Sequence, residues 1–391
     1  MQIDPPNTAL VITVPQNDFL TEKGVMWGGL LAKVCKKTTP PKTSRPSRSH
    51  TERMDNRWFL SGVLPNARLD ITFQHCRKLA ETWWMVGCHA PKRVLVPTKL
   101  IQLRRFKVPE KASRTATNAK RMHLQRRSPD YWRVTLDHPP LNIFGPESIP
   151  QLNEIITALE TDKDVKVVVF DSAVEGFFLT HYDFLAKPED TTGLPPGPTG
   201  LQPLPDMLVR LSRAPVVSIA SIRGRATGVG SELALACDMR FASREKAILS
   251  HWEVGAGVVP GGGPMARLPR LMGRGRALEV LLGADDIPGD LAELYGYVNR
   301  SLPDSDLDAF VESLATRIAS FDKRAISETK HFADVASLPP DFEIAPEWDV
   351  CFASIARPAA QKRIKTLMEL GFHKPGDVED RLGYYVGQLG R

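Results

Sequence analysis

The pattern of hydrophobic and polar positions predicts short strands and amphipathic helices over the second part of the chain. Residues 131–136 alternate well enough to predict a strand. Apolar side chains recur at helical spacing over residues 146–159, which predicts an amphipathic helix. Short, mostly apolar runs at 165–171 and 216–222 predict two buried strands.

The same kind of pattern continues toward the C-terminus. Pro and Gly are frequent over residues 188–206, which predicts a loop. Beyond this loop we expect strands at 239–242 and 247–249, and helices at 276–282, 291–297, 307–320 and 324–335. Short strands that alternate with helices are typical of the α/β fold class.

Charge divides the chain near residue 128. A chain of 391 residues, 42% of them hydrophobic, is long enough for two or more domains. Residues 33–127 hold 23 Lys and Arg against 5 Asp and Glu, whereas residues 128–391 carry a net charge of −10. We therefore expect a strand-like remnant at 1–32, a basic segment of low order at 33–127, a folded core at 128–300 and a C-terminal helical region at 301–391.

The basic segment has two interpretations. Clustered Lys and Arg neutralise phosphates, and Trp83 and Trp84 could stack on bases, so nucleic-acid binding is one of them. The sequence contains no motif of a nucleic-acid-binding module, which favours a solvated linker. The pairs His75-Cys76 and Cys88-His89 have the residue types of zinc ligands, but their spacing matches no zinc module, so we expect no metal.

Cysteine usage and hydropathy indicate a cellular compartment. The five cysteines are scattered and odd in number, which favours a reducing environment over a disulfide framework. No apolar run reaches the roughly 18 residues of a membrane span. Asp4 and Pro5-Pro6 stand where a secretory signal would be basic and then apolar. We expect a cytoplasmic protein that does not enter the membrane.

Two stretches in the middle of the chain predict one catalytic site. After the strand at 216–222, Gly224, Gly228 and Gly230 form a turn, and a helix is expected from about Ser231. Such a turn brings backbone N–H groups and the positive end of the helix dipole to a developing negative charge. Glu232 lies in the first turn of this helix, and Glu253 follows the next short strand. Two glutamates beside an oxyanion-stabilising turn indicate general acid–base chemistry.

These stretches resemble the enoyl-CoA hydratase/isomerase (crotonase) superfamily. The resemblance begins at Val134-Thr-Leu-Asp-His-Pro-Pro-Leu-Asn142 and covers about 200 residues, roughly 130–335. It includes the segments 165–170, 176–183, 215–238, 248–264 and 268–282. It implies an α/β fold, a crotonase-like ββα spiral with a C-terminal helical region. It also implies an acyl-CoA thioester as substrate and a homotrimer or hexamer.

The resemblance assigns roles to individual residues. It implies that Glu232 and Glu253 are catalytic and that the backbone N–H groups of Tyr182 and Val229 form the oxyanion hole. Family members usually have Ala-Gly-Ala-Asp where this chain has Thr180-His181-Tyr182-Asp183. The remaining substrate-binding candidates are His181, Asp183, Gly228, Gly230, His251 and Trp252. No cofactor is implied, since CoA belongs to the substrate, and Arg267, Arg270, Arg274 and Arg276 are weak candidates for contact with its phosphates.

The function implied is that of a 2-enoyl-CoA hydratase, a lyase that adds water across the double bond of an enoyl thioester. An isomerase or another enolate chemistry is the alternative within the superfamily. An RNA-binding or scaffold protein that uses the basic segment, with an inactive pocket, is the alternative from another class.

A second, shorter resemblance lies at the N-terminus. Residues 8–19 and 23–28 resemble the opening strand and loop of isochorismatase-like cysteine hydrolases. That family has an aspartate about where Val14 stands, and this chain has no matching later lysine and cysteine. We therefore assign this stretch no activity.

Overall fold

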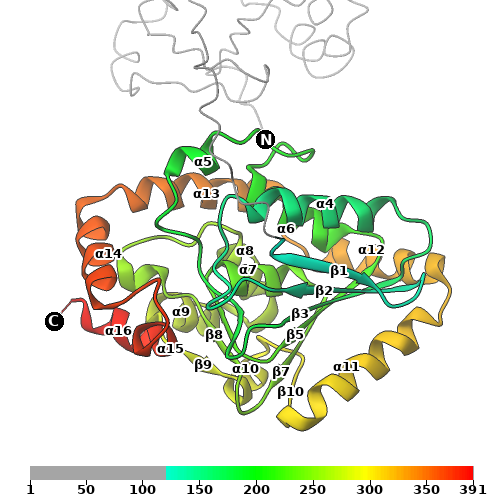
Figure 1. The fold of residues 1–391 in the computed structure, drawn as a ribbon. Coiled ribbons are helices and arrows are strands. Elements are labelled where there is room, and N and C mark those ends of the chain that lie inside the picture. The colour runs from blue at the N-terminus through cyan, green and yellow to red at the C-terminus, as the bar shows by residue number, and fades with distance from the viewer. Residues whose placement is uncertain (1–119, 391) are drawn as a thin grey trace, which may run out of the picture. The chain divides into compact units, whose positions relative to one another are not determined.

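Two sheets form the framework of the part of the chain that the computed structural model describes, residues 120–390 (Figure 1). The larger sheet has six strands in the order β1-β2-β3-β5-β7-β10. Its strands are β1 Met122–Arg126, β2 Tyr131–Leu136, β3 Val167–Ser172, β5 Val217–Ile222, β7 Met239–Ser243 and β10 Arg300–Leu302. Only the pairing of β1 with β2 is antiparallel within this sheet.

The smaller sheet has four strands in the order β4-β6-β8-β9. They are β4 Phe177–Leu179, β6 Arg225–Thr227, β8 Ile248–Ser250 and β9 Ile287–Pro288. The chain passes from β3 to β4, from β5 to β6 and from β7 to β8, so each of these long strands is followed by a short strand of the second sheet. This repetition is the ββα spiral that the sequence resemblance predicts.

Helices cover the sheets, and the C-terminal helices pack on the outside of this core (Figure 1). Those that alternate with the strands are α4 Ser148–Thr161, α5 Pro188–Thr192, α6 Pro203–Arg213, α7 Val229–Ala236, the 3-10 helix η4 Glu253–Ala256, α8 Pro264–Met272, α9 Arg274–Gly283, α10 Gly289–Tyr295 and α11 Asp304–Ala319. The C-terminal helices are α12 Lys323–Ser337, α13 Asp341–Ile355, α14 Pro358–Leu370, α15 Asp377–Asp380 and α16 Leu382–Gln388. Of these, α14, α15 and α16 lie together on one side (Figure 1).

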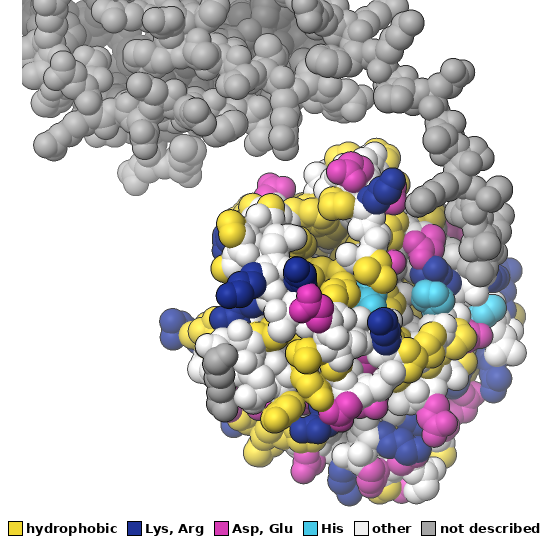
Figure 2. All heavy atoms as spheres, turned by 60° about the vertical axis from the view of Figure 1, so that its left-hand side comes forward, with side chains coloured by type: hydrophobic (Ala, Val, Ile, Leu, Met, Phe, Trp, Pro, Cys, Tyr) yellow, Lys and Arg dark blue, Asp and Glu magenta, His cyan; other side chains and the backbone are white. Residues whose placement is uncertain are grey.

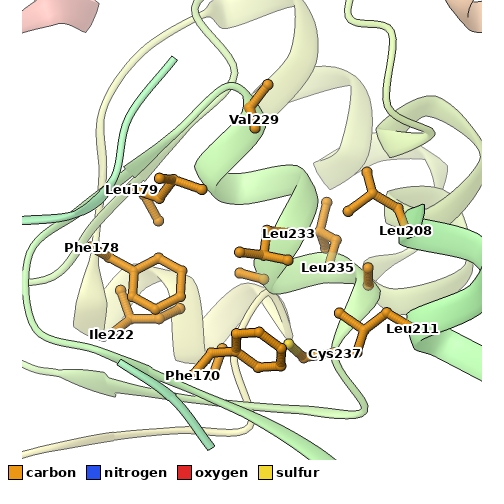
Figure 3. Packing of buried hydrophobic residues seen from close by; sticks show 14 of the residues in the cluster. Phe170, Phe178, Leu179, Leu208, Leu211, Ile222, Val229, Leu233, Leu235 and Cys237 are labelled. Carbon is orange, nitrogen blue, oxygen red and sulfur yellow. The ribbon is translucent and has the colours of Figure 1, made fainter. Parts of the chain in front are cut away.

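The two faces of the larger sheet are both buried. In β3, Val167 and Val169 pack in one cluster with α11, and Val168 and Phe170 pack in the main core with α4 and α6. A strand buried on both faces needs a continuous apolar run, which residues 167–170 provide. The main core also encloses α7, every residue of which is buried (Figure 3).

The structure confirms the strands and helices predicted at 131–136, 146–159 and 165–171, with ends shifted by a few residues. The prediction of a loop over 188–206 is wrong at both ends, because α5 occupies 188–192 and α6 begins at Pro203. Both helices have proline in the first turn, where its missing N–H would have no acceptor in any case. Pro signals a helix start here as well as a loop.

The ordered region begins before residue 128. Strand β1 spans Met122–Arg126 and pairs along its whole length with β2, so residues of the basic segment form the edge of the larger sheet. The remainder of that segment, the isochorismatase-like stretch and the pairs His75-Cys76 and Cys88-His89 lie outside the described residues. Within residues 120–390, no helix is long and apolar enough to cross a membrane, and no group of three metal-ligating side chains is present.

Asn142 joins the ends of three strands and provides a test of this framework. Its backbone has a φ of 55°, and its buried side-chain amide donates to Ser172 Oγ at 2.8 Å and to the Phe178 carbonyl at 3.0 Å. We expect N142A to lower the free energy of unfolding by about 3 kcal/mol, because it leaves buried acceptors without a donor and strains the backbone. The free energy of unfolding of N142G should be about 1 kcal/mol higher than that of N142A, since glycine tolerates a positive φ. Urea unfolding of both variants measures the difference, and equal midpoints would refute the contribution of backbone strain.

Candidate active site

Three turns meet at one edge of the smaller sheet. Strands β4, β6 and β8 are parallel neighbours, so their C-terminal ends lie together. The turn after β6 is bonded to both others: the N–H of Gly230 donates to the Thr180 carbonyl at 3.1 Å, and that of Gly228 donates to the Ser250 carbonyl at 3.0 Å. The sheet therefore brings together the segments that hold Tyr182, Val229 and Glu253.

Phe144 holds one side of the backbone around Tyr182. Phe144 pairs with it in a parallel bridge, in which the Phe144 N–H donates to the His181 carbonyl at 3.2 Å and the Asp183 N–H donates to the Phe144 carbonyl at 2.8 Å. Because successive N–H groups of an extended segment point to opposite sides, the Tyr182 N–H points away from Phe144. It has no acceptor among residues 120–390.

Val229 is the first residue of α7, two residues before the helix start expected at Ser231. An N–H in the first turn of a helix has no acceptor within that helix, and the Val229 N–H has none elsewhere in the described chain. Gly228, which precedes it, has φ 55° and ψ −118°, a conformation that residues with a side chain rarely adopt. Only a glycine here lets the chain turn from β6 into the helix in this direction.

Glu232 is a carboxylate inside a helix that is buried on all sides. The N–H of Gly262 donates to its Oε1 at 2.7 Å, so the Gly261-Gly-Gly263 segment holds this side chain in place. Burial raises the pKa of Glu232 to about 7, and the negative charge of Glu253 adds to the rise. His251 and the N–H groups of Gly262 and Gly261 act in the opposite direction.

Glu253 begins η4 and faces the turn at Gly228. A Cβ placed on Gly228 would lie 3.1 Å from Glu253 Oε1 and 3.1 Å from Trp252 Nε1, so both side chains reach the segment that holds the Val229 N–H. The Trp252 Nε1 and Glu253 Oε2 are buried and have no hydrogen-bond partner among residues 120–390. Buried polar atoms are seldom left unpaired. Those that are unpaired are often groups that bind a ligand.

His251 lies close to Glu253. Its Nδ1 is 3.6 Å from Glu253 Oε2, beyond hydrogen-bond distance, and its ring is stacked on Tyr297. The Tyr297 hydroxyl is in turn hydrogen-bonded to Ser231 of α7. This arrangement suits a residue that shapes the pocket.

The side chains of residues 181–183 reach elements outside the turn. His181 Nε2 is 2.9 Å from Glu379 Oε1, and the Tyr182 hydroxyl bonds to Thr191 of α5. Asp183 Oδ1 accepts the N–H of Leu185 at 2.9 Å. The histidine that stands in place of the usual glycine therefore packs against the C-terminal part of the chain. The face that carries the C-terminal helices has a hollow lined with hydrophobic side chains (Figure 2).

A third buried carboxylate, Glu347, was not found from the sequence. It lies on α13, and its Oε1 accepts the N–H of Ala266 at 2.9 Å, which caps the first turn of α8. Its Oε2 is buried without a hydrogen-bond partner in the described chain. Burial, and then the charge of Glu232, raise the pKa of Glu347 to about 8. An acidic residue between the apolar Ile344 and Trp348 was the only signal, and no spacing rule connects it to Glu232.

Comparisons with known proteins give a family match. A model of the enoyl-CoA hydratase/isomerase family matches residues 131–339.

The chain belongs to the enoyl-CoA hydratase/isomerase family.

Individual relatives within the family are moderately similar. The chain is 32% identical over 190 residues to the short-chain-enoyl-CoA hydratase of Clostridium acetobutylicum, covering 48% of this chain and 71% of that protein. It is 34% identical over 165 residues, or 42% of this chain, to the mouse enoyl-CoA hydratase domain-containing protein 2, mitochondrial, and spans 55% of its length. A Streptomyces avermitilis crystal structure, described as a "putative enoyl-CoA hydratase", is 38% identical with a TM-score of 0.65, covering 69% of this chain and 97% of that one.

Three arginines of α8 and α9 in this enoyl-CoA hydratase/isomerase family member make contacts within the chain that the sequence did not predict. Arg267 was a candidate for contact with the CoA phosphates, but its side chain is buried and donates to Ser212 Oγ at 2.9 Å. It is therefore not available to a phosphate. Arg270 pairs with Glu343, and Arg276 donates to the Leu294 carbonyl.

The raised pKa of Glu347 predicts how the stability of this family member depends on pH. Its native pKa of about 8 is above the ordinary value of 4.5, so its stabilising effect is complete below pH 4.5 and is lost as the pH rises to about 8. E347Q lacks this titration and keeps an oxygen for Ala266. We expect the Tm of E347Q minus that of the wild type to increase from pH 5 to pH 8 and then to level off.

Thermal unfolding across this pH range measures the difference. The matched control is E369Q, a change from an exposed carboxylate to an amide on α14, for which the difference should stay flat. A flat difference for E347Q as well would contradict the assigned environment of Glu347.

Proposed function

We propose that this chain is a 2-enoyl-CoA hydratase. The observation that carries the proposal is the convergence of two buried glutamates, Glu232 and Glu253, on the turn that begins α7, where the Val229 N–H has no acceptor among the described residues. The printed name of the Clostridium acetobutylicum relative supports the same activity.

The reaction starts with polarisation of the thioester carbonyl. The N–H groups of Tyr182 and Val229 donate to its oxygen, on which negative charge develops as the β-carbon is attacked. Donors that are already oriented stabilise this charge without reorganisation, and one such donor contributes about 3–4 kcal/mol to the transition state. Because the donors are backbone groups, the side chains at both positions are free to make other contacts.

The two carboxyl groups move the protons. Ionised Glu232 takes a proton from water while the water oxygen bonds to the β-carbon, and the electron pair of the double bond passes to the thioester oxygen as an enolate. This proton passes from Glu232 through solvent to Glu253, which gives it to the α-carbon, and the carbonyl re-forms. Both glutamates are then ionised again. The net change is the addition of one water molecule.

Substitution of each glutamate tests this mechanism. Hydration of crotonyl-CoA, a short enoyl thioester, is followed as loss of the ultraviolet absorbance of the conjugated thioester. We expect E232Q and E253Q each to lower kcat by about a hundredfold or more, because general acid–base catalysis contributes about 10²–10⁴. The matched control is E369Q on α14, which should keep full activity.

Two outcomes would count against hydration. If the wild type binds crotonyl-CoA without hydrating it, the hydratase assignment fails, and movement of the double bond of a 3-enoyl-CoA is tested next. If either glutamine variant keeps wild-type activity, that glutamate has no catalytic role.

The pH dependence gives an independent test of the role of Glu232. Its pKa is raised to about 7, and the mechanism requires its ionised form in the free enzyme. We therefore expect log kcat/KM to fall with a slope of about one per pH unit below pH 7 and to be level just above it. Initial rates at limiting crotonyl-CoA between pH 5 and pH 8 measure this limb. A level profile down to pH 5 would exclude Glu232 as the base.

We also infer that the protein forms a homotrimer or a hexamer, as the family resemblance implies. Three large apolar side chains on α12 and α13 support an association, since Phe332, Val335 and Phe342 are 73–75% exposed.

A further inference from the structure

A buried ion pair connects the turn after β4 with the C-terminal part of the chain. His181 Nε2 lies 2.9 Å and 3.1 Å from the two oxygens of Glu379 on α15, and both side chains are 1% exposed. The His181 ring also packs on Phe372, with ring centroids 4.1 Å apart. This pair is separate from Glu232 and Glu253, and the mechanism above does not use it.

Each ring nitrogen of His181 has a hydrogen-bond partner. Nε2 faces a carboxylate, and Nδ1 lies 2.9 Å from the carbonyl oxygen of Tyr182. Both partners can only accept, so a ring that carries a proton on each nitrogen satisfies both contacts. Glu379 supplies the counter-charge that allows such a cation to be buried.

The carboxylate of Glu379 is itself held by the chain around it. Its Oε1 accepts the backbone N–H of His373 at 2.7 Å. The Nε2 of His373 accepts the N–H of Phe184 at 3.2 Å, and its Nδ1 is 3.6 Å from Asp183 Oδ1. Segment 372–379 therefore contacts the turn both before and after Tyr182.

These contacts act on the peptide groups that flank the oxyanion donor. On one side, Phe144 bonds to the His181 carbonyl and the Asp183 N–H. On the other side, His181 Nδ1–H donates to the Tyr182 carbonyl. With both flanking peptides fixed, the Tyr182 N–H has one direction, and that direction is set partly by residues of the C-terminal segment.

We propose that His181 and Glu379 are positioning residues that aim the Tyr182 N–H at the thioester oxygen, so that segment 372–379 forms part of the oxyanion site. The proposal rests on the proposed acyl-CoA function. It explains why a histidine occupies the position where the family usually has glycine. The His181 ring is paired with Glu379 and also contacts the Tyr182 carbonyl.

The decisive variant is the double substitution H181F/E379L. Replacing a buried ion pair by apolar side chains of similar volume is often neutral or stabilising, so we expect a Tm near that of the wild type. The contact with the Tyr182 carbonyl is lost, and kcat should fall by about ten- to a hundredfold, since a small misplacement of a donor has effects of this size. KM and the Kd of butyryl-CoA should change by less than about threefold, because the ground state gains little from the donor.

E379Q is a second variant that keeps the volume of the pair and removes only its charge. Its kcat should fall by about three- to tenfold, because a neutral hydrogen bond replaces a charge-assisted one. D377N, a change from an exposed carboxylate to an amide on the same helix, is the matched control and should keep wild-type kcat.

The carbonyl stretch of bound butyryl-CoA, labelled with ¹³C at the thioester carbon and measured by difference infrared spectroscopy, reports the oxyanion contact directly. Butyryl-CoA has no double bond to hydrate, and hydrogen bonding lowers the frequency of its carbonyl. We expect the wild type and D377N to show the lowered frequency, and H181F/E379L and E379Q to return it toward the value in water.

Each outcome separates this proposal from the proposed function. If both variants keep wild-type kcat and the lowered frequency, while only Tm changes, the pair is structural and the positioning role is overturned. If the wild type hydrates no enoyl-CoA but binds butyryl-CoA, the hydratase function fails, and the infrared shift still decides the positioning role. If no CoA ester binds to the wild type, both proposals fail. Should H181F/E379L not fold, the frequency in E379Q decides.

Discussion

The alignment of three short parallel strands is the constraint on which the site depends. Strands β4, β6 and β8 are only three residues long each. Their C-terminal ends nevertheless bring together the backbone N–H groups of Tyr182 and Val229 and the side chain of Glu253. Hydrogen bonds from Gly228 and Gly230 connect the three turns directly. Because those bonds are made by the backbone, the positions of the donors depend on the register of the sheet and little on the side chains at Tyr182 and Val229.

The sequence singles out the local parts of the candidate site. Glu232 follows a short apolar run and a glycine-containing turn, and Glu253 follows another short strand, so period and turn chemistry make both of them candidates. Glu347 and Glu379 could not be found in this way, because each meets its partners only when the C-terminal helices pack on the core. The loop expected at 188–206 failed for a different reason, since Pro203 begins a helix there.

Burial of carboxyl groups is costly, and this family member buries several close together. Glu232 and Glu347 respond with raised pKa values of about 7 and about 8, so a proton partly replaces a counter-ion. Glu379 follows the other route: burial acts to raise its pKa, but the charge and hydrogen bond of His181 outweigh burial and lower it. The C-terminal helices thus contain one carboxyl group with a raised pKa, Glu347, and one with a lowered pKa, Glu379.

The position of Glu379 along the chain has a consequence for biosynthesis. A ribosome makes every strand of both sheets before it makes α15, so a nascent chain can form the sheets while His181 still lacks its carboxylate. Until α15 emerges, His181 lacks the Glu379 contact, and Phe144 still bonds to the backbone on either side of Tyr182. The His181–Glu379 contact can therefore form only after every strand of both sheets has been synthesised.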